Sequence, residues 1–347
     1  MSEQEKHCNF TRRAFMASAI AAPVALAGNI SLTHANDDTA HAGRARADDT
    51  IHTGGAKNIA LKEGYNAWAK PVAIQPGTLP VLTLHGGPGL PHFYFECFED
   101  YLPQAGIGYW YYDQLGSGFA DQPKDKALWN LERFVAEVEQ VRASLGLEKF
   151  VLFGHSWGGL LAIEYALNYP QRLSGLVISN MTASIQSYLK RIAALRAQLP
   201  AKTAHRLAEL ERARAYDSQE YESIVFDTLY REHICRLDPM PEPVTRAVRW
   251  MSAPVYNTMQ GRSEFEVTGT LKGWDRWNDL HKIAAPALIL GGQFDTMDPE
   301  DLRRMSRVMP NATTVICENG SHLSMYDDQE AYFAALVPFL KKTTRIT

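Results

Sequence analysis

The chain has 347 residues, of which 46% are apolar and 21% charged, the composition of an ordinary globular protein rather than of a disordered or fibrous one. Its formal net charge of −4 and the lack of a basic block argue against nucleic acid as a partner. The length is compatible with two domains, or with one large domain that carries an insertion.

The first 35 residues have the pattern of an export signal. Arg12 and Arg13 precede an Ala-rich apolar run over residues 17–28 that is too short to span a bilayer. Paired arginines before such a run are typical of a twin-arginine signal, although an N-terminal helix that merely contains Arg-Arg is the alternative. We expect cleavage after Ala35, with Ala27 as the other option, and export to the periplasm or the medium.

Four cysteines set the expected redox state. Cys8 would leave with the signal, and the remaining Cys97, Cys235 and Cys317 have neither a CxxC nor a metal-ligand spacing. Because twin-arginine substrates typically fold before export, in a reducing compartment, we expect three buried thiols.

Runs of strand length alternate with helical patterns through the first half of the chain. A mixed segment over 59–72 suggests edge strands, and an amphipathic helix is expected over 131–145. Buried strands are expected at 79–84, 109–113, 150–153 and 173–179. This alternation predicts parallel strands joined by right-handed crossovers.

Glycine-rich loops follow two of these strands. The strand at 79–84 leads into His85-Gly86-Gly87-Pro88-Gly89, which can form neither helix nor regular strand. Such a loop at the carboxyl end of a strand leaves backbone N–H groups available to an oxyanion, although an ordinary tight turn is the alternative. The strand at 109–113 ends in a second glycine-bearing turn, Gln114-Leu115-Gly116-Ser117-Gly118.

The strand at 150–153 is followed by Gly154-His155-Ser156-Trp157-Gly158 and then by a helical pattern that ends before Pro170. This is the G-x-S-x-G nucleophile elbow, a tight strand-to-helix turn that exposes its serine. We expect the glycines at 154 and 158 to let the strand and the helix approach closely. The pentapeptide alone is a weak signal because Gly and Ser are common, but a strand before it and a helix after it make the signal more specific.

The alternation stops after Thr182. From residue 184 to about 274 the chain is charged and helical in pattern, with helices expected over 188–199, 201–216, 220–235 and 243–251. The α/β pattern then returns, with strands at 286–292 and 313–317 and helices at 299–309 and 328–340. This return indicates an inserted cap rather than a second independent domain. The expected organisation is a signal peptide (1–35), a disordered leader (36–56), an α/β core (57–182 and 275–347) and a helical cap (183–274).

Ser156, Asp295 and His322 each follow a predicted strand, in the chain order of an α/β-hydrolase triad. His322 can take the serine proton near neutral pH, and Asp295 would fix the tautomer of its ring. We choose Asp295 over Asp298 because Asp298 precedes Pro299 and suits a helix N-cap. The oxyanion would lie against the N–H of Trp157 and of one glycine of the 86–87 pair.

Three further polar residues lie beside these turns. His85 and His155 flank the glycine turns and are expected to be structural or to line a pocket. Asp113 ends a strand and is expected to hold loops by hydrogen bonds rather than to transfer protons.

The two glycine loops and the elbow, in this order, resemble the proline iminopeptidase family of α/β-hydrolases, which remove an N-terminal residue, preferentially proline, from peptides. The likeness runs from about Leu79 to the C-terminus and includes the cap segment 264–275. The resemblance implies a mostly parallel sheet flanked by helices, with an inserted helical cap. It also implies these roles: Ser156 as nucleophile, Asp295 and His322 completing the triad, and Gly87 with Trp157 as oxyanion donors.

The resemblance also bears on the substrate. In this family acidic residues hold the free α-amine, and Glu264 falls on one such cap position; without the resemblance it would be interpreted as a solvated charge. A second Glu can directly follow the catalytic Asp, whereas here Thr296 stands there. One carboxylate instead of two should weaken the hold on a buried amine by about 1–3 kcal/mol. Another cap acid such as Glu222 could compensate.

We therefore expect a serine hydrolase that releases an N-terminal proline, or a similar small residue, from peptides through an acyl-enzyme. An amino-acid (proline) amidase or a small-molecule esterase with the same triad is the alternative, and Thr296 favours it. A non-catalytic binding module is disfavoured because the triad is complete. No cofactor or metal is expected. The expected partner is a small peptide or an amino-acid amide, with no stable membrane span once the signal is removed.

Overall fold

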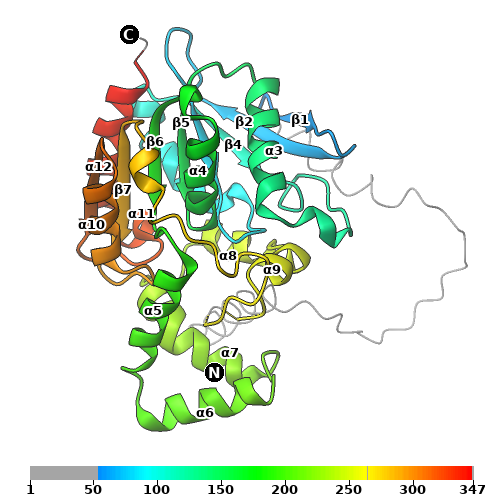
Figure 1. Ribbon diagram of the computed structural model, residues 1–347, viewed down its shortest axis with the longest axis vertical. Coiled ribbons are helices and arrows are strands. Elements are labelled where there is room, and N and C mark those ends of the chain that lie inside the picture. Colours follow the sequence, from blue (N-terminus) through cyan, green and yellow to red (C-terminus); the bar gives the residue numbers. More distant parts are fainter. Residues whose placement is uncertain (1–53, 264, 346–347) are drawn as a thin grey trace, which may run out of the picture.

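The computed structural model describes residues 54–263 and 265–345 (Figure 1). The predicted signal peptide, most of the leader and Glu264 lie outside the described residues. An eight-stranded sheet in the order β1-β2-β4-β3-β5-β6-β7-β8 forms the centre. Its strands are β1 (Lys57–Ala60), β2 (Asn66–Val72), β3 (Val81–Leu84), β4 (Tyr109–Asp113), β5 (Phe150–His155), β6 (Leu173–Ser179), β7 (Ala287–Gly292) and β8 (Ala312–Cys317).

The pairing of the strands confirms the predicted mostly parallel sheet. Strands β3 to β8 are parallel to one another, and β2 pairs antiparallel with both β1 and β4 at one end of the sheet. The carboxyl ends of β3, β5, β7 and β8 therefore lie at one edge. The loops that carry the candidate site residues leave from that edge.

Helices cover both faces of the sheet (Figure 1). Residues that are paired across two adjacent strands point to the same face of the sheet, whereas successive residues of one strand point to opposite faces. The register therefore shows which face each helix covers. Gly154 faces α4 and Gly291 faces α10, whereas the Ser179 hydroxyl lies 2.9 Å from the Tyr332 hydroxyl of α12 on the other face. One face thus carries α3 (Leu131–Ser144), α4 (Trp157–Asn168) and α10 (Pro299–Val308), and the other carries α12 (Gln329–Thr343) and the 3-10 helix η1 (His92–Asp100). Two shorter helices, α11 (Ser324–Asp327) and η6 (Leu280–Lys282), lie in loops.

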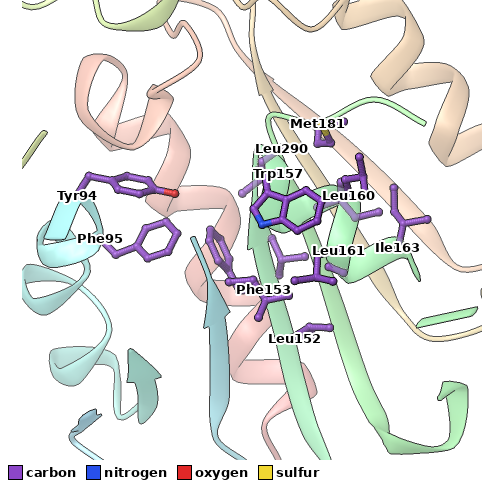
Figure 2. Close-up of a cluster of buried hydrophobic side chains, with 14 of the residues drawn as sticks. Tyr94, Phe95, Leu152, Phe153, Trp157, Leu160, Leu161, Ile163, Met181 and Leu290 are labelled. Atoms are coloured by element: carbon purple, nitrogen blue, oxygen red, sulfur yellow. The ribbon is translucent and has the colours of Figure 1, made fainter. Parts of the chain in front are cut away.

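Aromatic rings pack on the elbow strand and on the first residue of the helix that follows it; Figure 2 shows Phe95, Phe153 and Trp157 among them. Phe153 of β5 meets Phe95 and Phe98 of η1 edge-on, with ring centroids 5.5 and 5.1 Å apart. On the other face the Trp157 ring packs on Phe134 of α3 at 5.5 Å. Such pairs contribute about 0.5–1.5 kcal/mol each beyond the area they bury. The backbone around Ser156 is therefore held rigidly.

A helical segment lies between β6 and β7, as the change of pattern after Thr182 predicts (Figure 1). The structure adds α9, which the sequence did not predict, and it divides the expected helix at 220–235 into α7 and a π-helix. The elements are α5 (Ile185–Arg196), α6 (Ala201–Arg212), α7 (Gln219–Val225), the π-helix η5 (Phe226–Ile234), α8 (Glu242–Arg249) and α9 (Ala253–Met259).

The two ends of this segment are tied to each other and to the elbow helix. Ile185 N–H donates to the Trp274 carbonyl at 2.9 Å, and Arg276 N–H donates to Ala183 at 2.8 Å. Glu164, buried on α4, accepts from the Trp274 indole and from the Arg276 guanidinium, both at 2.6 Å. The segment is thereby fastened to the helix that follows Ser156.

The predicted thiols are confirmed for the described residues: Cys97, Cys235 and Cys317 are buried and form no disulfide. Across the described ranges, no helix combines the length and the apolar character that a membrane crossing requires.

Candidate active site

The elbow places Ser156 in a strained backbone conformation, with φ 56° and ψ −125°. A Cβ at Gly154 would collide with the carbonyl of Gly158, and a Cβ at Gly158 would collide with the carbonyl of Leu84 at the end of β3. Both glycines are therefore required by close backbone approach, as the sequence predicts. Strain of this kind, roughly 1–3 kcal/mol, is maintained by the rigid packing around it.

Asp295 and His322 form a hydrogen-bonded pair. The ring Nδ1–H of His322 donates to Asp295 Oδ1 at 2.8 Å, and Asp295 also accepts from Met297 N–H at 3.0 Å and from the Asn180 amide at 2.7 Å. Burial alone would raise the pKa of Asp295, but the charge of His322 and these hydrogen bonds outweigh burial and lower it. The carboxylate thus stays ionised at neutral pH, and with Nδ1 bonded to Asp295 the ring nitrogen that can accept a proton is Nε2.

Asp298 and Asp113 have the structural roles that the sequence predicts for them. Asp298 caps α10 by accepting from Glu300 N–H at 3.0 Å. Asp113, fully buried, accepts from the backbone and the ring of His92 at 2.8 and 2.9 Å and from Phe119 N–H at 3.0 Å. These hydrogen bonds hold loops and a helix end, whereas Asp295 bonds to the ring of His322.

Two backbone N–H groups are positioned as candidate oxyanion donors. Gly86 N–H donates to the Tyr94 hydroxyl at 2.6 Å, which leaves Gly87 as the donor of the glycine pair. Trp157 is the first residue of α4, so its N–H has no acceptor within the helix. Gly87 and Trp157 both line the cavity that contains Ser156.

Two buried histidines support these loops from within. Nε2 of His155 lies 2.9 Å from the carbonyl of His322, and its Nδ1 lies 3.1 Å from the Tyr94 hydroxyl. Nε2 of His85 accepts from Gln114 N–H at 3.0 Å. Burial lowers the pKa of His155 to about 3 and that of His85 to about 4, so both are neutral at neutral pH. His85 is structural, and His155 also lines the cavity.

The cavity above Ser156 has a volume of about 1060 Å³, which includes space open to solvent. Helix α8 turns an apolar stripe with helical spacing toward it, formed by Val244, Ala247 and Val248 and continued by Met251. Polar groups lie elsewhere on the wall: Tyr188, Tyr230, Tyr256, Gln260 and Thr296. The cavity is therefore bounded by the sheet edge below and by cap helices above.

The expected amine-binding carboxylates are not found among the described residues that line this cavity. Thr296 lines it and bonds to Asp295 Oδ1 at 3.2 Å, while Glu264 lies outside the described residues. Glu222, half-buried on α7, is not part of the wall, so the structure does not support its compensating role. Nor do the described residues contain three His, Cys, Asp or Glu side chains grouped as metal ligands.

Sequence reasoning missed Asn180 and Tyr94. Asn180 bonds to Asp295, and it directly follows β6 with φ 53°, a conformation that Asn tolerates better than most residues. A polar residue at the carboxyl end of a parallel strand was the available signal. Tyr94 lies in a 3-10 helix whose pattern resembles neither an α-helix nor a strand, so the sequence carried no signal for it.

Comparisons with known proteins agree with this architecture. Residues 80–329 match the family described as the alpha/beta hydrolase fold. The chain is 40% identical over 279 residues to a proline iminopeptidase of Flavobacterium johnsoniae, covering 80% of this chain and 94% of that protein. It is 42% identical over 285 residues to one of Chitinophaga pinensis, with the same coverage. The crystal structure of the Mycobacterium smegmatis proline iminopeptidase superposes with a TM-score of 0.77 at 30% identity, covering 83% of this chain and 98% of that one. The chain belongs to the proline iminopeptidase family of α/β-hydrolases.

Proposed function

We propose that the protein releases an N-terminal proline, or a similar small residue, from peptides through an acyl-enzyme formed on Ser156. It is a serine hydrolase of the aminopeptidase type. The observation that carries the proposal is the 2.8 Å hydrogen bond between His322 and Asp295, with His322 lining the same cavity as Ser156 in a member of this family.

In the acylation step, the Ser156 hydroxyl attacks the carbonyl carbon of the N-terminal residue while Nε2 of His322 takes its proton. The carbonyl oxygen becomes an oxyanion, which the N–H groups of Gly87 and Trp157 stabilise. The C–N bond then breaks, and the leaving amine takes the proton from His322. Asp295 stabilises the imidazolium throughout and is not itself protonated.

Deacylation repeats these steps with water. His322 takes a proton from a water molecule as it attacks the ester carbon, and the oxyanion forms against the same two N–H groups. The bond to the Ser156 oxygen breaks, and His322 returns the proton to that oxygen. The free N-terminal residue leaves as a carboxylic acid, which loses its proton to the solvent at neutral pH, and the enzyme is restored.

The test is a substrate panel on the mature protein. The wild type should hydrolyse a proline anilide and Pro-X dipeptides, and Ser156→Ala should abolish both activities. Blocking the substrate amine should abolish turnover by the wild type, because an aminopeptidase requires the free N-terminus. Activity retained on N-acylated substrates would contradict the assignment as an exopeptidase.

An amino-acid amidase or a small-molecule esterase is the second candidate. The observation in its favour is Thr296, whose hydroxyl faces Asp295 at the position where a second carboxylate can stand in the family. Rates on prolinamide, a Pro-X dipeptide and a p-nitrophenyl ester separate the two candidates. Faster turnover of the amide or the ester than of the dipeptide would favour the second.

We also propose export by the twin-arginine route. Arg12 and Arg13 ahead of the apolar run over 17–28 support it, and these residues lie outside the described part of the chain. Residues 1–35 fused to a folded reporter should carry it to the periplasm of a bacterium with twin-arginine machinery. Replacing both arginines by lysine should retain the reporter in the cytoplasm; unchanged fractionation would contradict the proposal.

A further inference from the structure

The cap contacts the two loops that carry Asp295 and His322 through the end of the π-helix η5. The backbone N–H of His322 donates to the carbonyl of His233 at 3.0 Å, and Leu323 N–H donates to the carbonyl of Ile234 at 2.9 Å. The Ser321 hydroxyl also donates to the Ile234 carbonyl, at 2.8 Å. The loop that bears the candidate base is thus hydrogen-bonded to the cap over three consecutive residues.

The side chain of His233 reaches the second loop. Its Nδ1 lies 2.7 Å from the carbonyl oxygen of Phe294, the residue that precedes Asp295. Because a carbonyl oxygen only accepts, Nδ1 carries the hydrogen. Burial lowers the pKa of His233, so the ring is neutral at neutral pH. One cap residue therefore bonds through its backbone to His322 and through its ring to the chain beside Asp295.

The same π-helix also borders the cavity. Tyr230 and Ile234 line the cavity, whereas His233 does not. A π-helical segment is rare and is often found at functional sites, because it turns a side chain out of the register of an ordinary helix. Here a substrate that packs on Tyr230 and Ile234 would press on the segment that holds both loops.

We propose that His233 is a positioning residue through which the cap holds His322 and Asp295 in alignment. The proposal rests on the proposed triad but not on the identity of the substrate. A displacement of about 1 Å at a catalytic group can cost on the order of 10² in rate. Loss of the ring hydrogen bond should therefore lower kcat about 10- to 100-fold, while KM changes little because His233 does not line the cavity.

The test compares three substitutions. Asn at position 233 can donate from where Nδ1 stands, whereas Gln places its amide at the position of Nε2 and Leu donates nothing. His233→Leu and His233→Gln should lose kcat, and His233→Asn should recover most of it. His205→Asn, on the exposed surface of α6, is the control and should match the wild type. If the Leu variant fails to fold, the kcat values of the Gln and Asn variants can still be compared with each other.

Two readouts separate positioning from other roles. The rate at which a fluorophosphonate labels Ser156 reports nucleophile activation whatever the substrate, and it should fall in parallel with kcat. If the wild type is labelled but does not cleave proline substrates, the proposed substrate fails while the His233 comparison still stands. The proposal is overturned if the Asn and Gln variants are equally active or equally impaired, or if the Leu variant raises KM and leaves the labelling rate unchanged.

Discussion

The sheet edge and the cap hold their polar side chains in different ways. At the sheet edge Asp113 and Asp295 are fully buried, and each accepts three or more hydrogen bonds from different segments. In the cap, charges meet at the surface, as in the Arg206–Glu220 pair, whose side chains are 45% and 51% exposed. Water screens such a pair, so it adds little stability. The edge is therefore intolerant of change, while the cap surface can vary at small cost.

This difference matches a division of labour. The groups that would carry out the chemistry lie on the edge, whereas the cap contributes eleven of the 24 residues that line the cavity, among them the apolar stripe of α8. The two regions also meet at buried contacts, of which the hydrogen bond from the Trp274 indole to the Glu164 carboxylate is one. Substitutions at the edge, at that contact and on the cap surface should therefore have clearly graded effects.

The largest effect is expected at Asp295. Asp295→Asn keeps the shape of the side chain but removes the charge that stabilises the imidazolium, so kcat should fall by roughly 10⁴. Asp298→Asn is the matched control, since Asn caps a helix as well as Asp does, and it should leave kcat unchanged. Both are measured by steady-state hydrolysis of a proline anilide. Similar kcat values for the two variants would contradict the assignment of Asp295.

The next effect concerns the oxyanion loop. In Gly87→Ala the new Cβ would lie 2.6 Å from Gly89 N and 2.7 Å from Leu90 N, at a φ of 111°, so the loop must shift. Displacing one oxyanion donor should lower kcat by about 10²–10³. Gly146→Ala also has a positive φ, 69°, but its Cβ meets nothing within 4 Å. Gly146→Ala should lower stability and leave kcat unchanged. If Gly146→Ala also lowered kcat, backbone strain alone would explain the loss in Gly87→Ala.

A smaller effect is expected where the cap is fastened. Glu164→Ala removes the acceptor of the Trp274 indole and two hydrogen bonds of the Arg276 guanidinium, which keeps its bond to Asp279. Because Arg276 remains partly solvated, the free energy of unfolding should fall by about 2–3 kcal/mol rather than more. Denaturant unfolding measures this, and limited proteolysis should show faster cleavage in the cap. Glu220→Ala, at the surface pair with Arg206, should change neither result.

Features that depend on local patterns could be predicted from the sequence. Strand β6 and the start of α3 are found at the predicted residues because apolar periodicity is a property of one short segment. Asp298 was recognised as a cap from its neighbour Pro299 alone. The elbow glycines were recognised because the motif itself encodes the tight turn.

Contacts between distant segments could not be predicted. Asn180 bonds to Asp295 across 115 positions of the sequence, and His155 bonds to the carbonyl of His322 across 167. The π-helix η5 keeps the apolar pattern of an ordinary helix, so 220–235 was predicted as one element. The sequence located the reacting groups, but not the side chains that hold them in place.

The buried histidines of the sheet edge should affect stability rather than rate, and the effect of one histidine over one pH unit should be smaller than that of losing Glu164. In the folded state the pKa of His155 is about 3 and that of His85 about 4, against about 6.5 for an unfolded chain. Below pH 6.5 the unfolded state binds protons that the folded state does not. Stability should therefore fall as the pH drops from 6.5 toward 4, by about 1.4 kcal/mol per pH unit for each histidine.

Denaturant unfolding at pH 7, 6 and 5 measures this slope. His155→Gln removes one of the two groups, so its slope below pH 6.5 should be smaller than that of the wild type by about one proton, whatever its absolute stability. His205→Gln, whose side chain is 72% exposed in the cap, should keep the wild-type slope. Equal slopes for the wild type and His155→Gln would mean that His155 is not held neutral in the folded protein. In that case the sheet edge would be more accessible to water and to charge than its buried hydrogen bonds indicate.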